Sequence, residues 1–368
     1  MRIQILWLSS SIWFTGCGDK SGLLETSSPI PNAAAVVIDN PVSPSLSSNT
    51  PPSILKPDSM LQMPIGNRGL RNLGNTCYFN ALMQVLAHSD PLVRYLKTLD
   101  ISPGVAEYTR AFKNLILEIW DEKKGLQAIN PKSFLDMCRA NSPLTFIAGQ
   151  QQDSYEAYTK IFESIEDDGL LRLVTFEWDS ILRCNSPVAE SRRREQYTDW
   201  QIIIPESVEA VKLEDLMKGW GNREKRDWNC GITGDPNNES ATQEYYLASA
   251  PETLVVMLKR YEYRKSESQA HKFMTPVTFS TEIDLGVIFA GRLVPALVSG
   301  GPGSLKYNLV GVVNHHGSAP NSGHYNADYY NTHYKQWFHA NDASCSKIDV
   351  PGTRPSSLPY MFIYTKAQ

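Results

Sequence analysis

The 368-residue chain has no broad basic excess and no clustered cysteines, and beyond its first 20 positions it has no long apolar run. A membrane helix needs roughly 18 or more apolar residues, so we expect no membrane span in the body of the chain. The formal charge of -4 offers no general attraction for phosphate backbones, and we expect no nucleic-acid partner. The six cysteines are spread over the whole sequence, which argues against a small disulfide scaffold and favours free thiols.

The first 17 residues have the form of a secretory signal, with one arginine followed by an apolar region from Ile3 to Phe14. The ending Phe14-Thr15-Gly16-Cys17 resembles a bacterial lipobox, in which Cys17 would carry a lipid anchor. An ordinary signal peptide and a start codon placed too early are the alternatives. We assign residues 1–24 to a signal-like segment.

Residues 25–64 have a different composition, because they hold many of the 23 prolines together with serine and asparagine. No helical or strand periodicity is sustained there. We expect this segment to be a disordered linker that precedes a folded region at 65–368.

Apolar periodicity begins after residue 65. Apolar side chains spaced as on one helix face occur at 78–86 and 105–119, and further helices are expected from Pro131 and from about Gln151. Strand patterns follow, at 254–258, 277–279, 307–313 and 360–364. Helices first and strands later predict an α+β fold.

Cys77 is the first candidate for chemistry. The segment Asn72-Leu73-Gly74-Asn75-Thr76 is a glycine-containing turn that delivers Cys77 to the start of a helix. Unpaired N–H groups and the helix dipole favour an anion at that position, so we expect a lowered thiol pKa and a nucleophilic cysteine.

Two segments far along the chain can complete a catalytic set. His324 lies in the small-residue loop Asn321-Ser322-Gly323 and is the candidate general base. Asn341 and Asp342 follow and can orient an imidazole. A cysteine, a distant histidine and an asparagine or aspartate have the logic of papain-like peptidases.

The motifs resemble those of the ubiquitin-specific proteases. Residues 69–84 resemble the Cys box of that family, residues 151–156 its QQD box, residues 258–261 a strand ending in LKRF, and residues 315–317, 323–325 and 341–342 its His box. The motifs occur in the family's order and spacing. The resemblance implies a papain-like cysteine peptidase fold with thumb, palm and fingers subdomains. The helical half would form the thumb and the later strands the palm.

The resemblance also implies residue roles. Cys77 is the nucleophile, His324 the base, Asn341 the third triad member and Asp342 an assisting carboxylate. Asn72 is the expected oxyanion donor, together with the backbone N–H of Cys77. The implied reaction is hydrolysis of the isopeptide bond at the C-terminal glycine of ubiquitin, without a cofactor.

The expected substrate-binding residues follow from the same motifs. Gln151, Asp153 and Glu156 would bind the C-terminal tail of ubiquitin, and Tyr325 would line a narrow cleft for its two glycines. Asp153 and Glu156 are three apart on a helix, so both carboxylates should project from one face. The alternative is an acidic helix start that suits the dipole.

The sequence departs from many relatives at the zinc ribbon of the fingers, which we place at about 171–249. Cys184 and Cys230 each begin a CxxC pair whose second cysteine is missing, since Pro187 and Thr233 stand there. Two thiolates make a poor closed zinc site, so we expect no metal.

Two other functions stay open, namely a protease for another ubiquitin-like modifier such as SUMO and an inactive ubiquitin-binding module. The signal-like start also has to be reconciled with a ubiquitin-directed enzyme. A bacterium living with eukaryotic cells could secrete or anchor this effector and use it on host ubiquitin. The alternative is a cytoplasmic eukaryotic enzyme with a misassigned start.

Overall fold

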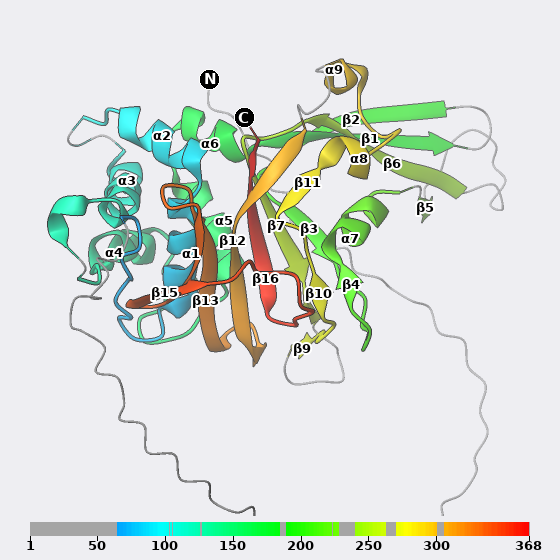
Figure 1. The fold of residues 1–368 in the computed structure, drawn as a ribbon. Helices are drawn as coiled ribbons and strands as arrows, with labels where there is room; N and C mark the ends of the chain where they lie inside the picture. Colours follow the sequence, from blue (N-terminus) through cyan, green and yellow to red (C-terminus); the bar gives the residue numbers. More distant parts are fainter. Residues whose placement is uncertain are drawn as a thin grey trace, which may run out of the picture. The chain divides into compact units, whose positions relative to one another are not determined.

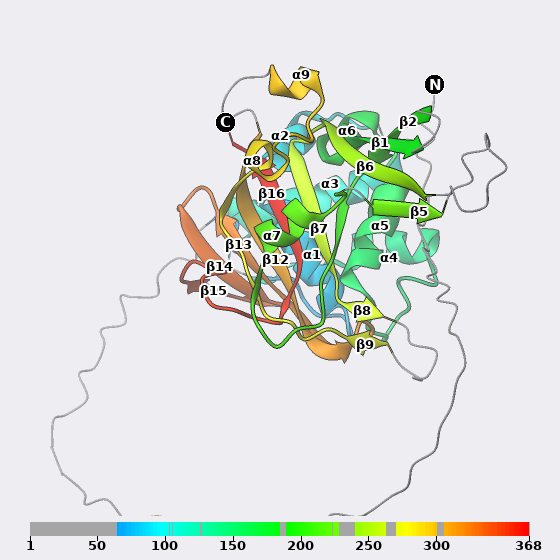
Figure 2. The same ribbon diagram turned by 90° about the vertical axis from the view of Figure 1, so that its right-hand side faces the viewer.

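A computed structural model describes residues 65–102, 104, 106–125, 127–184, 189–222, 224–227, 240–262, 270–299 and 305–367. The signal-like segment with Cys17, the linker and Cys230 lie outside these residues. Figures 1 and 2 show helices from the first part of the chain packed beside a large sheet from the second part. The expected α+β fold is confirmed.

The helices of the thumb precede the first strand. They are α1 (Cys77–Ala87), α2 (Asp90–Thr98), α3 (Glu107–Ile119), α4 (Lys132–Asn141), α5 (Ser154–Ser164) and α6 (Asp168–Val174), with a short 3-10 helix at Glu122–Lys124. Helix α4 begins one residue later than expected because Pro131 is its N-cap. Helix α5 begins at Ser154 because the side chain of Asp153 caps it.

The palm is an eight-stranded sheet. Its order is β15 (Ser344–Ile348), β14 (Gln336–Asn341), β13 (Ser322–Asn331), β12 (Lys306–Ala319), β16 (Pro359–Lys366), β7 (Thr253–Lys259) and β3 (Trp200–Ile203), with β11 (Glu282–Asp284) beside β12. Only β3 and β7 pair in parallel within this sheet. Figure 1 shows the orange strands β13 and β12 of this sheet beside α1.

A second sheet extends from the palm on the side opposite the helices (Figure 1). It has the order β2 (Ala189–Tyr197), β1 (Phe176–Cys184), β6 (Ser240–Ser249) and β5 (Glu224–Asp227). At its base the rings of Trp178, Trp200 and Phe289 pack together with centroids 5.0 to 5.7 Å apart. This aromatic cluster fixes the second sheet to the palm.

The remaining described elements are short. They are β4 (Val211–Lys212), α7 (Leu213–Gly219), β8 (Tyr261–Glu262), β9 (His271–Lys272), β10 (Val277–Thr278), α8 (Leu285–Ile288) and α9 (Pro295–Val298). Within the described ranges, no helix is long and apolar enough to cross a bilayer.

Helix α1 lies on the palm sheet and is buried along its whole length. Alternate residues of β13, namely Tyr325, Ala327 and Tyr329, are fully buried, as expected for a strand with one face against a helix. Gly311 of β12 lets the helix approach, because a Cβ there would lie 2.7 Å from Val85 and 2.8 Å from the carbonyl oxygen of Asp328. The last turn of α1 therefore packs closely on the sheet, and at its other end Cys77 meets Tyr325, near the start of β13.

We predict that Gly311→Ala destabilises the chain by about 1–3 kcal/mol, since the added methyl overpacks the contact between α1 and the sheet. Gly219→Ala is the matched control, because no atom lies within 4 Å of a Cβ built at that helical position. Urea unfolding of both variants measures the difference. Equal midpoints for the two would contradict the close approach.

Candidate active site

Cys77 is held at the first position of α1 by a loop that closes on itself. Asn72 Oδ1 accepts hydrogen bonds from Gly74 N (3.0 Å) and Thr76 N (3.1 Å), and Leu73 N donates to Thr76 Oγ1 (2.9 Å). Asn75 has a left-handed φ of 55° and donates from Nδ2 to Gly149 O at 2.8 Å. The turn expected from the sequence is therefore present, and it ties the nucleophile candidate to the loop before α5.

The surroundings of Cys77 favour its neutral thiol form. Burial raises its pKa above the ordinary value, and the charge of Asp342 raises it further, while the backbone amide of Tyr325, 3.5 Å from Sγ, lowers it. The expectation of a lowered thiol pKa is wrong for this state, because the loss of solvent outweighs the amides at the helix start. In the described part of the chain, no hydrogen bond joins Cys77 to His324.

His324 is oriented by its predicted partner. Its Nε2 lies 2.7 Å from Asn341 Oδ1, across neighbouring strands β13 and β14. A side-chain carbonyl oxygen accepts, so we assign the proton to Nε2, which leaves Nδ1 as the basic nitrogen. This is the tautomer that a general base in a cysteine peptidase requires.

Asp342 lies at the turn after β14, with a left-handed φ of 50°. Its Oδ2 accepts from Asn72 Nδ2 at 2.9 Å, and its Oδ1 accepts from Asn80 Nδ2 at 2.7 Å. Asn72 is itself exposed, so its amide is open to an incoming group. The structure thus brings together four of the predicted catalytic side chains in two pairs, His324 with Asn341 and Asn72 with Asp342.

Asp153 and Glu156 are arranged differently from the expectation of two carboxylates on one open face. Asp153 Oδ1 accepts from Tyr155 N (2.7 Å) and Glu156 N (3.0 Å), and Oδ2 accepts from Tyr360 OH (2.7 Å). Burial raises the pKa of Asp153 to about 6. Asp153 precedes the helix as its cap, so its carboxylate points to the helix backbone and not alongside Glu156.

Gln151 lines a cavity of about 690 Å³ beside the candidate catalytic residues. The cavity is bounded by the loop before α5 and by the loop between β12 and β13, and its other lining residues are Asn75, Ile147, Gln150, Gln152, Asn321, Ser322 and Gly323. The Gln151 Nε2 atom is buried without a partner in the described residues. A free buried donor in the wall of this cavity suits a substrate with backbone carbonyls.

Tyr325 does not present its ring to this cavity. Its side chain is fully buried, packs on the ring of His315 at 4.2 Å and donates from its hydroxyl to Pro320 O at 3.0 Å. The expectation that its side chain lines the cleft is wrong, because alternation along β13 turns residue 325 toward α1. Its backbone N–H is what meets the Cys77 thiol.

His315 belongs to the segment 315–317 that resembles the His box, but no role of its own was predicted for it. Its Nε2 donates to Ser322 O at 3.0 Å, and its Nδ1 accepts from Tyr261 OH. Burial lowers its pKa to about 4, with a further contribution from the charge of Lys272, so the ring is neutral. This buried ring supports the loop that leads to His324. Its position beside the His324 motif was the available signal.

Two further features concern metal and thiol chemistry. Within the described ranges, no group of three or more His, Cys, Asp or Glu side chains is arranged to hold a metal ion. Cys184 is disulfide-bonded, whereas Cys77, Cys138 and Cys345 are free. The expectation of free thiols is therefore wrong for Cys184.

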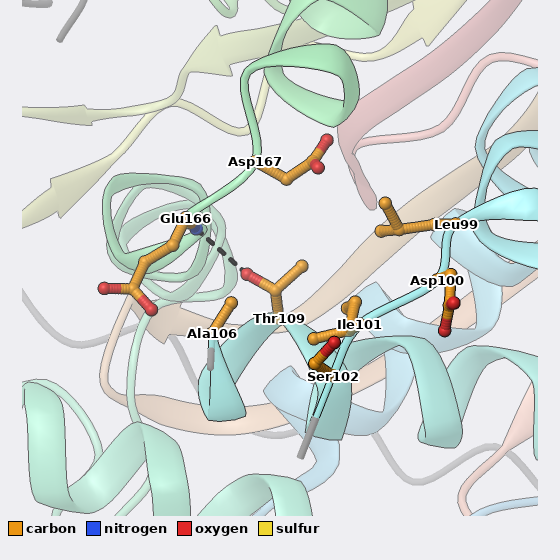
Figure 3. Close-up of a pocket in the computed structure, with 8 residues that line it drawn as sticks. All are labelled: Leu99, Asp100, Ile101, Ser102, Ala106, Thr109, Glu166 and Asp167. Atoms are coloured by element: carbon orange, nitrogen blue, oxygen red, sulfur yellow. Dashed lines mark hydrogen bonds between the residues drawn. The ribbon is translucent and has the colours of Figure 1, made fainter. Parts of the chain in front are cut away.

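A second cavity of about 250 Å³ lies between the segment joining α2 to α3 and the segment joining α5 to α6 (Figure 3). Figure 3 shows the hydroxyl of Thr109 accepting from Glu166 N, at 2.9 Å. Its eight lining residues include no cysteine or histidine. It therefore has no thiol and no imidazole for the cysteine-histidine chemistry expected at Cys77.

Comparison with known proteins agrees with this geometry. Residues 68–364 match the family described as ubiquitin carboxyl-terminal hydrolase. The chain belongs to this family, which confirms the family resemblance seen in the sequence.

The individual relatives are distant. Ubiquitin carboxyl-terminal hydrolase 3 of Homo sapiens is 25% identical, and the match covers 82% of this chain and 68% of that protein. Ubiquitin carboxyl-terminal hydrolase 36 of Drosophila virilis is 25% identical over 70% of this chain, and the match spans only 22% of that protein.

Two solved structures share the fold. The SAGA Ubp8 module bound to ubiquitin aldehyde has a TM-score of 0.67 at 20% identity, covering 84% of this chain and 71% of that one. The SAGA module bound to monoubiquitin has a TM-score of 0.66 at 19% identity, covering 84% and 73%.

We predict that Asp153→Asn removes a pH-dependent part of the folding stability. Because the folded-state pKa of Asp153 is raised to about 6, its contribution is present below about pH 4 and is lost as pH rises to 6. The loss amounts to about 2–3 kcal/mol at most. Urea unfolding from pH 4 to 7 should show a shallower decline in the variant, whose amide can still cap α5. An identical decline in both proteins would contradict a raised pKa.

Proposed function

We propose that the chain is a deubiquitinase that cleaves the isopeptide bond at the C-terminal glycine of ubiquitin. The observation that carries the proposal is the meeting of α1 with β13. It places the Cys77 thiol against the backbone amide of Tyr325, the residue directly after His324. The wall of the larger cavity includes Asn75, two residues before Cys77, and Gly323, the residue before the oriented His324.

The reaction follows from these positions. The Cys77 sulfur attacks the carbonyl carbon of the terminal glycine while its proton passes to Nδ1 of His324. The developing oxyanion accepts hydrogen bonds from Asn72 Nδ2 and the Cys77 N–H. His324 returns the proton to the departing lysine amine, and a thioester remains on Cys77. Water deprotonated by His324 then releases ubiquitin and restores the thiol.

The lining of the cavity supports a glycine-rich substrate tail. Seven of its eight lining residues are polar and uncharged or glycine, so the wall offers hydrogen bonds without competing charge. Main-chain amides of a Gly-Gly segment suit such a surface, because they bring donors and acceptors but no side chains. Glu156, whose Oε1 accepts from Thr145 Oγ1 at 2.9 Å, is the carboxylate we assign to the basic part of the tail.

We also propose that residues 65–368 form the catalytic domain and that the fingers contact the globular part of ubiquitin. The export signal and lipid anchor inferred for residues 1–24 remain a separate proposal about where the enzyme acts. The fingers contact and the N-terminal segment concern how the enzyme reaches its substrate, and neither changes the chemistry proposed at Cys77.

We predict that ubiquitin carrying a C-terminal electrophile labels the full chain on Cys77. The raised thiol pKa slows reaction with small alkylating agents, so labelling should depend on the ubiquitin part of the probe. Peptide mapping locates the adduct, with Cys138→Ala and Cys345→Ala as controls that keep the labelling. An adduct on either control cysteine would contradict the assignment, and faster labelling by a SUMO probe would favour the other modifier.

A further inference from the structure

We propose that Asn80 is a positioning residue for the reaction, which acts through the Asp342 carboxylate to hold the Asn72 amide at the oxyanion. This inference rests on the proposed function. It assigns a role to a residue one turn beyond the nucleophile that contacts neither the thiol nor the cavity wall.

Asn80 is fixed in one orientation. It lies on the buried face of α1 with 1% of its surface exposed, and its Nδ2 faces three oxygen atoms. These are Asp342 Oδ1 at 2.7 Å and the carbonyl oxygens of Leu70 and Arg71, both at 3.3 Å. The reversed amide would bring its own oxygen against three acceptors, so only the observed orientation is stable.

This orientation has a cost in stability. Asn80 Oδ1 is buried and has no partner in the described residues. An unsatisfied buried acceptor lowers stability. Gln84 Oε1, on the same face of α1, is also buried without a partner in the described residues, so this cost alone does not distinguish Asn80. The distinguishing feature is that Asn80 Nδ2 donates to the side chain of Asp342, whereas Gln84 Nε2 donates to a backbone carbonyl.

Asp342 links Asn80 to Asn72 through its carboxylate. Its Oδ1 accepts a hydrogen bond from Asn80 Nδ2, and its Oδ2 accepts one from Asn72 Nδ2. No lysine, arginine or histidine in the described ranges forms an ion pair with it. Its backbone oxygen accepts from Leu70 N at 2.8 Å, so the main chain is anchored and the side chain is the part that Asn80 fixes.

Asn72 is thereby held at both ends of its amide. Its Oδ1 accepts hydrogen bonds from the N–H groups of Gly74 and Thr76, and one hydrogen of its Nδ2 is donated to Asp342. The second hydrogen of Nδ2 is left for a ligand, and the planar amide determines its direction. Preorganised donors of this kind stabilise a transition state without reorganising, whereas a rotating amide does not. Asp342 disfavours the Cys77 thiolate, so holding Asn72 is a better account of this carboxylate than activating the thiol.

A double-mutant cycle tests the proposal. Asn80→Ala removes the donor that fixes the Asp342 carboxylate, and Asp342→Asn removes the charge that takes the Asn72 amide hydrogen. If Asn80 acts through Asp342, the two losses share one cause and do not add. Asparagine is close to isosteric with aspartate and tolerates the left-handed conformation at position 342.

We expect each single variant to lose about 10- to 100-fold in kcat on a ubiquitin substrate with little change in KM, approaching the loss of Asn72→Ala. The double variant of Asn80→Ala with Asp342→Asn should lose no more than about threefold beyond the worse single variant, rather than the product of the two losses. The affinity ratio of ubiquitin aldehyde to ubiquitin should fall in each single variant and fall little further in the double one, because only the aldehyde forms an oxyanion-like adduct on the thiol. This ratio separates positioning from a loss of fold.

Gln84→Ala is the matched control. Gln84 is the next buried amide on the same face of α1, and its Nε2 donates to Arg68 O at 2.8 Å without contact to Asp342. It should cost stability while kcat stays near wild type. Equal kcat values for Asn80→Ala and Gln84→Ala, or losses that multiply in the double variant, would overturn the role of Asn80. An inactive wild type would instead overturn the proposed function.

Discussion

The contact between the start of α1 and the start of β13 is the interaction on which the candidate site depends. It joins residues 248 positions apart, with the Cys77 sulfur 3.5 Å from the amide of Tyr325. Helix α1 is buried throughout, and the sheet beneath it is continuous from β15 to β3. The relative position of nucleophile and base is therefore set by core packing, which is rigid at the level of single methyl groups.

The electrostatics around Cys77 oppose a permanently charged thiolate. Burial and the carboxylate of Asp342 both favour the neutral thiol, and the backbone amides only partly offset them. His324 has its Nε2 engaged by Asn341 and its Nδ1 available. In the proposed reaction, the neutral thiol stays unreactive until a substrate carbonyl arrives and proton transfer to His324 accompanies attack. A neutral thiol is also less open to oxidation and to stray alkylation.

Short motifs allowed the family and the geometry of the candidate site to be predicted, while the catalytic roles of Cys77, His324, Asn341 and Asn72 stay predictions. The turn before Cys77 contains its own hydrogen-bond partners, so a local pattern identifies it. His324 meets Asn341 as the spacing of the motifs implies. The ring of Tyr325 was misplaced because strand alternation depends on which face meets α1. The thiol pKa was misjudged because desolvation depends on distant residues. Asn80 could not be assigned, since its role exists only when the turn at Asp342 folds against the helix.

Turnover tests the central claim most directly. The substrate is ubiquitin joined through its C-terminal glycine to a fluorogenic amine, and the enzymes are the full chain and its His324→Gln variant. The account predicts saturable release of the amine by the wild type and a loss of at least about 100-fold in kcat for the variant, whose ubiquitin affinity is retained. Absence of release by a folded wild-type chain that binds ubiquitin would contradict it.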